Sequence, residues 1–128
     1  MKKLLIVLIS ILLIFTLTAC GNEEVGIEDN RTLEHFVQAF RDAGYEIANV
    51  LGPFGPDPDG SIDSISFSIM QNGTEVNAVI ISQFDSEEAL NRFYEDGKKT
   101  FNLTKNGLFI MLAFFAKEDF DEFFIAIE

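Results

Sequence analysis

Few residues in this chain could do chemistry. It has one cysteine, Cys20, and one histidine, His35, and neither stands in a catalytic sequence pattern. The chain contains no Gly-x-Ser-x-Gly turn, no glycine-rich phosphate loop and no His-Glu-x-x-His pair. One histidine and one cysteine are too few for an ordinary zinc site or a histidine-based triad. The acids fall mainly at predicted helix ends and faces, so we predict a protein that is not an enzyme and uses no cofactor.

A group of acids follows a loop rich in proline and glycine. Residues 52–60 contain all three prolines of the chain and three glycines, so they can form neither a helix nor a strand. Three aspartates lie at the end of this loop: Asp57, Asp59 and Asp63. With Gly60 they resemble part of the EF-hand calcium loop, although Gly55 and Ser66 replace its first and last acids. We interpret the segment as a tight turn, with cation binding by the three aspartates as the alternative.

The first twenty-one residues have the layout of a secretory leader. Lys2 and Lys3 give a short positive end, and residues 4–17 are almost wholly apolar. The segment ends with Leu17, Thr18, Ala19, Cys20 and Gly21, in which small residues flank the cysteine. The apolar run falls just short of the roughly 20 residues of a transmembrane helix. An ordinary cleaved leader would not explain why the only cysteine stands at the cleavage point.

This end of the leader resembles the lipobox of bacterial lipoproteins. In that motif a leucine and two small residues precede a cysteine that is lipidated and becomes the new N-terminus. The resemblance implies a diacylglyceryl thioether on Cys20, with an acyl group such as palmitate on its amine in many bacteria. It also implies a location on the extracytoplasmic side of the cell membrane, where two acyl chains hold a protein durably. We therefore expect a signal peptide over residues 1–19 and a lipidated, flexible, acidic tether over residues 20–30.

The rest of the chain, residues 31–128, has the length of one domain. The whole chain has a net charge of −12, which becomes −14 when Lys2 and Lys3 leave with the leader. Because such a domain is repelled by phosphates, we predict no nucleic-acid partner. With Cys20 committed to lipid, no disulfide can form, and stability must come from packing. The main source is phenylalanine, of which the chain has fourteen.

The apolar spacing predicts the order helix, three strands, helix, one or two strands, helix. The helices begin at Asn30 or Thr32, after Asp85 and Ser86, and at Asp119. The strands cover 45–51, 64–69, 74–84, 101–103 and 108–116. Asn72-Gly73 and Asn106-Gly107 predict tight turns between strands. The predicted fold is α+β, a two-layer sandwich with an antiparallel sheet of four to five strands and helices against one face.

The two faces of this sheet are predicted from alternation along its central strands. Three serines alternate with three apolar residues over 64–69, so one face is apolar and the other is lined with hydroxyls. On the next strand, residues 74–84, alternation that starts with Val76 in the core places Ala78 and Ile80 in the core as well. It places Val79 and Ile81 on the opposite face. The C-terminal helix, residues 119–127, either covers that second face or leaves it for another protein. We favour cover within the chain and a monomer, since monomers seldom expose a large apolar patch.

These features predict a membrane-anchored extracytoplasmic lipoprotein. Its function would be that of a non-catalytic binding or protein-interaction module, with an envelope protein as partner. The alternative is a lipoprotein that binds a small ligand or a cation. That alternative would use the 52–63 loop or a pocket between the sheet and a helix.

Overall fold

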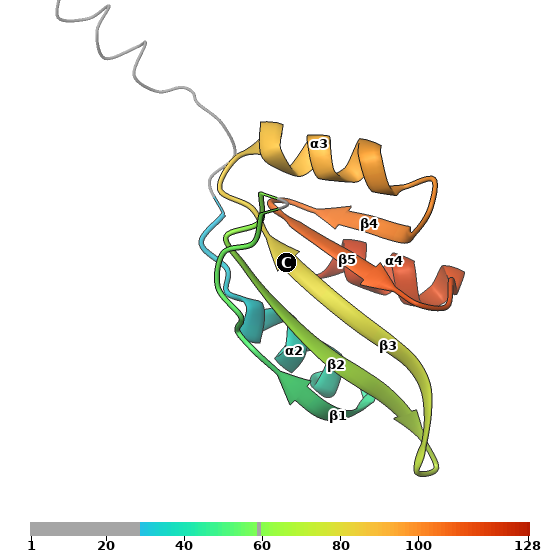
Figure 1. Ribbon diagram of the computed structural model, residues 1–128. Coiled ribbons are helices and arrows are strands. Elements are labelled where there is room, and N and C mark those ends of the chain that lie inside the picture. Colours follow the sequence, from blue (N-terminus) through green and yellow to red (C-terminus); the bar gives the residue numbers. More distant parts are fainter. Residues whose placement is uncertain (1–28, 59) are drawn as a thin grey trace, which may run out of the picture.

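The computed structural model describes residues 29–58 and 60–128. These residues form three helices and one antiparallel sheet with the strand order β1-β2-β3-β5-β4 (Figure 1). In chain order the elements are α2 (Leu33–Asp42), β1 (Glu46–Leu51), β2 (Asp63–Gln71), β3 (Thr74–Gln83), α3 (Glu87–Gly97), β4 (Asn102–Asn106), β5 (Phe109–Ala113) and α4 (Glu118–Ala126). The predicted α+β class and antiparallel sheet are confirmed.

Local signals in the sequence define the ends of these elements. The Thr32 side chain caps α2 by accepting a hydrogen bond from the His35 N–H at 3.2 Å. Ser86 caps α3 by accepting one from the Ala89 N–H at 3.1 Å. Between β2 and β3, Asn72 has φ 54° and its glycine neighbour φ 81°, as a two-residue hairpin turn requires. These two caps and the Asn72-Gly73 turn therefore form where the sequence predicts them. The predicted Asn106-Gly107 turn lies one residue later, because Asn106 ends β4 and pairs with Phe109, which leaves Gly107 and Leu108 as the turn.

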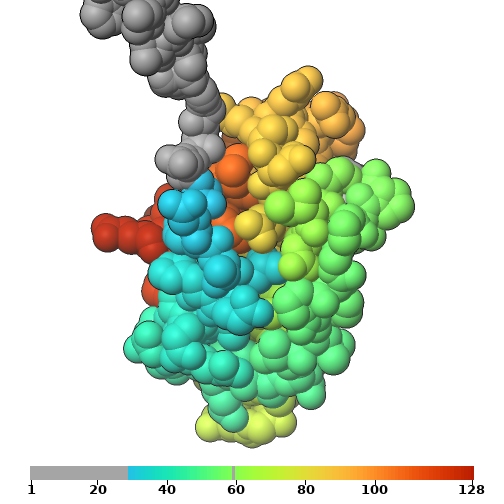
Figure 2. Space-filling view, turned by 90° about the vertical axis from the view of Figure 1, so that its left-hand side faces the viewer, coloured from blue at the N-terminus to red at the C-terminus, as the bar shows by residue number. Residues whose placement is uncertain are grey.

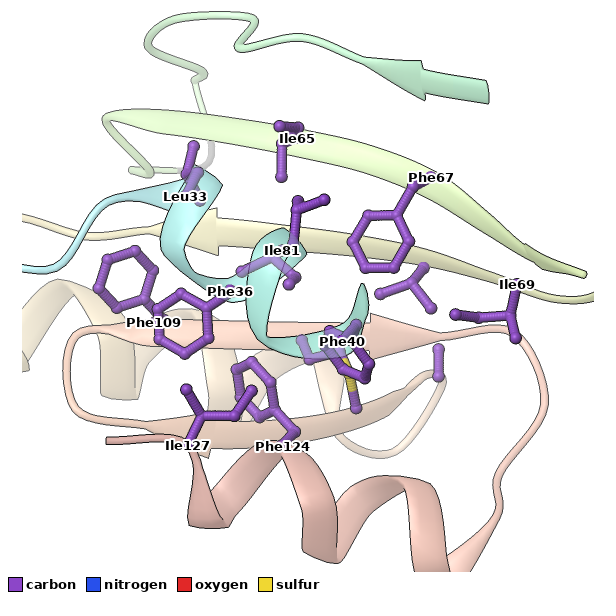
Figure 3. Close-up of a cluster of buried hydrophobic side chains, with 14 of the residues drawn as sticks. Leu33, Phe36, Phe40, Ile65, Phe67, Ile69, Ile81, Phe109, Phe124 and Ile127 are labelled. Carbon is purple, nitrogen blue, oxygen red and sulfur yellow. The ribbon is translucent and has the colours of Figure 1, made fainter. Parts of the chain in front are cut away.

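The main hydrophobic core lies between α2, α4 and one face of the sheet, which we call the aromatic face. The Phe36 ring of α2 lies 4.5 Å from the Phe109 ring of β5 and 5.3 Å from the Phe124 ring of α4, measured between centroids (Figure 3). Phe40 of α2 lies 5.1 Å from Phe120 of α4. The two helices therefore share one core instead of lying on opposite faces of the sheet.

The predicted side-chain directions on β3 are wrong beyond its first residues. Val79 pairs with Phe67 and Ile81 with Ile65, so these residues of β3 also face the aromatic core. The register shifts near the turn, where Val76 is an extra residue on β3. Such a β-bulge moves every later side chain to the other face of the sheet. Alternation counted from Val76 could not reveal this extra residue.

The assignment of the C-terminal helix to the second face also needs correction. α4 covers the aromatic face beside α2, and the opposite face is covered by α3 (Figure 1). Leu90 of α3 packs with Phe84, Leu103 and Ile110 in a separate, smaller core. Because these partners come from the end of β3 and from β4 and β5, that core lies over one half of the face. None of the described helices covers the half over β1 and β2.

The described chain begins with a residue that is bound to the domain. Asp29, predicted to belong to the tether, accepts hydrogen bonds from Arg31 Nε and Nη2, both at 2.8 Å, and from the Leu108 N–H at 3.0 Å. Arg31 Nη1 donates to the Ile127 carbonyl at 3.0 Å, and its Nη2 also donates to Asn106 at 3.0 Å. This Asp29–Arg31 cluster connects the start of the domain, the β4–β5 turn and the last residues of the chain.

Candidate functional site

The face of the sheet opposite α2 and α4 is lined by serines over β2 and β3. Ser64, Ser66 and Ser68 project to this side because alternate residues of a strand point to opposite faces. Ser82 of β3 lies directly across from Ser64. The predicted hydroxyl-lined face of the second strand is therefore confirmed. We call this side of the sheet the serine face.

Two walls flank this floor of serines. Phe54 and Asp57, from the loop that follows β1, form one wall, where the Phe54 side chain is 59% exposed. α3 forms the other wall with Phe93, and both walls lie at the same end of the molecule (Figures 1 and 2). Between them lies a depression of about 400 Å³ with Ser64, Ser82 and Ile110 in its lining. Its size falls in the range of small-ligand sites.

A second depression of about 240 Å³ continues the first along β2. It shares Ser66 and Ile80 with the first depression and extends to Ser68. Its apolar rim is formed by Leu51 and Phe114, whose side chains are both largely exposed. Together the two depressions form one open channel along the strand, which we call the serine groove.

The hydroxyls at one end of the serine groove have no hydrogen-bond partner among the residues that the structure describes. Ser64 is only 6% exposed and Ser82 only 8%, yet neither hydroxyl makes a hydrogen bond within the described residues. Ser68 receives one long hydrogen bond, 3.5 Å from Asn49 Nδ2. Among the described residues, the side-chain atoms that are fully buried without a partner are Asn102 Nδ2 and Asp121 Oδ1, so the hydroxyl oxygens of Ser64 and Ser82 stay accessible from the groove. This pair can therefore bind a group that enters the groove.

Asp63 holds the loop wall against the sheet. Its Oδ1 accepts hydrogen bonds from the Gly55 N–H at 2.8 Å and from the Ser64 N–H at 2.9 Å. The Phe54 N–H donates to the Ser64 carbonyl at 3.0 Å. Gly52 makes this approach feasible, since its φ is 108° and an added Cβ would lie 2.9 Å from the Ser64 carbonyl oxygen. The loop thus presents Phe54 from a backbone that is fixed by hydrogen bonds.

The three aspartates predicted as an alternative cation site have different environments. Asp63 is engaged in the loop, while Asp57 is exposed and lines the serine groove. Asp59 lies outside the described residues. Within residues 29–58 and 60–128, no three His, Cys, Asp or Glu side chains are placed to hold a metal ion. Cation binding by these aspartates stays a prediction.

The ionisable and polar groups of the serine groove are few. Among its described lining residues the only ionisable one is Asp57. His35 lies on α2, where its Nε2 is 2.6 Å from the backbone oxygen of Glu128, and it does not line the groove. The serine hydroxyls and the apolar side chains of the groove can offer a ligand hydrogen bonds and apolar contacts.

Another depression, of about 470 Å³ and separate from the serine groove, lies near the β2–β3 turn and next to α4. Burial and the nearby carboxylate of Asp119 raise the pKa of Tyr45, which lines it. Of its polar side chains, Asn77 is already engaged. It donates to the Phe115 carbonyl at 3.1 Å and accepts from the N–H groups of Phe115 at 3.1 Å and Ala78 at 2.9 Å. Charged side chains also line this depression, among them Glu46, Lys117 and Asp119.

The predicted lipidation site, Cys20, and the predicted leader lie outside the described residues. In the part of the chain that the structure does describe, no helix has both the length and the apolar composition that spanning a membrane requires. Comparison of the chain with protein-family models, curated protein sequences and solved structures finds no match.

The walls of the serine groove were not predicted as site residues. Phe54, Phe93 and Phe114 come from a loop, a helix and the end of a strand, and their positions around the serines depend on the tertiary fold. Two signals in the sequence point to this face: the serine alternation on β2, and the 52–63 loop offered as an alternative ligand site, from which Phe54 and Asp57 line the groove.

Proposed function

We propose that this protein is a membrane-anchored extracytoplasmic binding module and that the serine groove is its ligand site. The observation that carries the proposal is the pair of hydroxyls on Ser64 and Ser82. Both side chains are more than nine-tenths buried, and neither hydroxyl has a partner among the described residues. A ligand that covers these hydroxyls must hydrogen-bond to them, because covering them without a partner would be unfavourable.

The anchor in this proposal is lipid on Cys20, as the lipobox resemblance implies. Eight residues separate Cys20 from Asp29, the first residue that the structure describes. Such a segment can span at most about 30 Å. The serine groove would then remain close to the membrane surface, where it meets ligands of the cell envelope.

Photo-crosslinking in intact cells tests the location of the ligand site. A photoreactive amino acid replaces Ser66, which lies on the floor of both depressions, or Thr74, an exposed strand residue outside them. The proposal predicts an adduct on irradiation from position 66 and none from position 74. The absence of any adduct at position 66, or the same adducts at both positions, would contradict it.

The anchor is tested separately by mass spectrometry of the chain isolated from membranes. The expected result is a chain that begins at Cys20 and carries acyl chains on that residue. An unmodified thiol or an intact leader would remove the anchor from the proposal.

A further inference from the structure

We infer that the ligand of the serine groove is an extended polypeptide segment, uncharged or basic, with apolar side chains at alternate positions. This inference rests on the proposed function of the groove and adds the chemical class of its ligand. It is carried by the spacing of the groove's hydroxyls, by the position of its apolar subsites and by its charge.

The spacing of the serines matches that of an extended peptide. Ser64, Ser66 and Ser68 are alternate residues of one strand, so their hydroxyls repeat about every 6.8 Å. An extended peptide has the same repeat, because two of its residues also cover about 6.8 Å. A segment that lies along β2 can therefore place a main-chain N–H or C=O group near each successive hydroxyl. Main-chain groups need such partners when they leave water.

The two depressions provide apolar subsites at the same interval. The first contains Phe54 and Phe93, and it lies over Ser64 and Ser66. The second has Leu51 and Phe114 at its rim, and it lies one two-residue step further along the strand. In an extended peptide the side chains of residues i and i+2 point to the same side. Two such side chains can fill both subsites at once.

The chemistry of the groove favours a polypeptide over other ligands of similar length. A fatty acyl chain would cover Ser64 and Ser82 without offering them a hydrogen bond, which is unfavourable. A nucleic acid would be repelled by a chain whose net charge is −12. Because Asp57 is the only ionisable group among the described lining residues, a basic residue next to the apolar pair is favoured over an acidic one.

The test is a selection of random seven-residue peptides on the full chain, purified in detergent. We expect the bound peptides to share apolar residues at positions i and i+2, with few acids. Ser66→Phe fills the junction of the two depressions and should weaken binding of these peptides by tenfold or more. Thr74→Phe, a matched change at an exposed strand position outside the groove, should alter the dissociation constant by less than twofold.

A second variant keeps the test decisive if Ser66→Phe disturbs the fold. Ser64→Ala combined with Ser82→Ala removes only the two buried hydroxyls and should weaken peptide binding about tenfold. Peptides that bind all variants equally, or a selection without the alternating apolar pattern, would overturn the peptide class. The proposed function would still stand if position 66 crosslinks in cells to a molecule that yields no peptide fragments on digestion. If position 66 gives no adduct, the groove itself is refuted as the site.

Discussion

The two faces of the sheet differ in what their side chains do. On the aromatic face, Phe36, Phe40 and Phe124 are fully buried between two helices and the strands. On the serine face, α3 covers the β4 and β5 half, while hydroxyls and exposed apolar side chains line the rest. Both faces are built from the same strands, since alternate residues point in opposite directions. The comparison indicates that the aromatic face carries the larger core, while part of the serine face stays open as the proposed ligand site.

The largest effect should come from a core phenylalanine of the aromatic face. Phe40→Ala removes a fully buried ring and should lower the free energy of unfolding by about 3–5 kcal/mol. Phe54→Ala, the matched change at the rim of the serine groove, should alter it by less than about 0.5 kcal/mol, because that side chain is 59% exposed. Urea unfolding of the chain from residue 21 onward measures both. Equal losses would mean that the two faces do not divide stability and binding in this way.

The Asp29–Arg31 cluster should give the next largest effect. Hydrogen bonds from Arg31 hold the pKa of the Asp29 carboxyl at about 2, against an ordinary value of 3.8. A carboxyl whose pKa is lowered by folding stabilises the protein at pH values above its pKa in the unfolded chain. This contribution is lost as the pH falls from about 4 to about 2. The size of this contribution, which follows from the pKa shift, is roughly 2 kcal/mol. Solvent screens it little, because the Asp29 side chain is only 4% exposed. The cluster belongs to the aromatic face, where the Arg31 guanidinium lies 4.9 Å from the Phe36 ring centroid.

Asp29→Asn isolates this contribution from the other carboxylates. At pH 7 the variant should unfold more easily than the natural chain by roughly 2 kcal/mol. The difference between the two chains should shrink as the pH is lowered from 5 to 2, because protonation neutralises Asp29 in the natural chain. Urea unfolding across this pH range measures it. A difference that does not change with pH would show that the Asp29 charge is not what stabilises the cluster.

A smaller difference should distinguish α3 from α2. The helix α2 buries four side chains, whereas α3 buries only Leu90 completely. We therefore expect the backbone amide hydrogens of α3 to exchange with solvent faster than those of α2, because α3, which forms one wall of the groove, can unfold locally. Ser86→Ala removes the α3 cap and should cost about 1 kcal/mol, seen as still faster exchange in α3 alone. Equal protection of the two helices would argue that both are held by cores of similar strength.

Features coded by neighbouring residues could be predicted from the sequence. Asn72-Gly73 forms its turn, and Thr32 and Ser86 form their caps, because these structures need only residues close in the chain. The alternation of serine and apolar residues on β2 is also local, and its two faces are as predicted.

Features that depend on the whole fold could not be predicted in this way. The bulge at Val76 adds one residue to β3 and reverses the faces of Val79 and Ile81, although nothing in the alternation marks it. The position of α4 beside α2 depends on contacts such as Phe40 with Phe120, which are 80 residues apart in the chain. The walls of the serine groove also come from distant segments, so the sequence indicates its floor and the 52–63 loop but not the positions of Phe93 and Phe114 beside them.

The most direct test of the account is the stability of the chain that carries both Ser64→Ala and Ser82→Ala. If the two hydroxyls serve a ligand and not the fold, the free energy of unfolding without ligand should stay within about 0.5 kcal/mol of the natural value or rise by up to about 1 kcal/mol. Urea unfolding of the natural and double-variant chains, compared under the same conditions, gives this difference. A loss of 1 kcal/mol or more would contradict the account, because it would show that these serines are bonded within the folded protein.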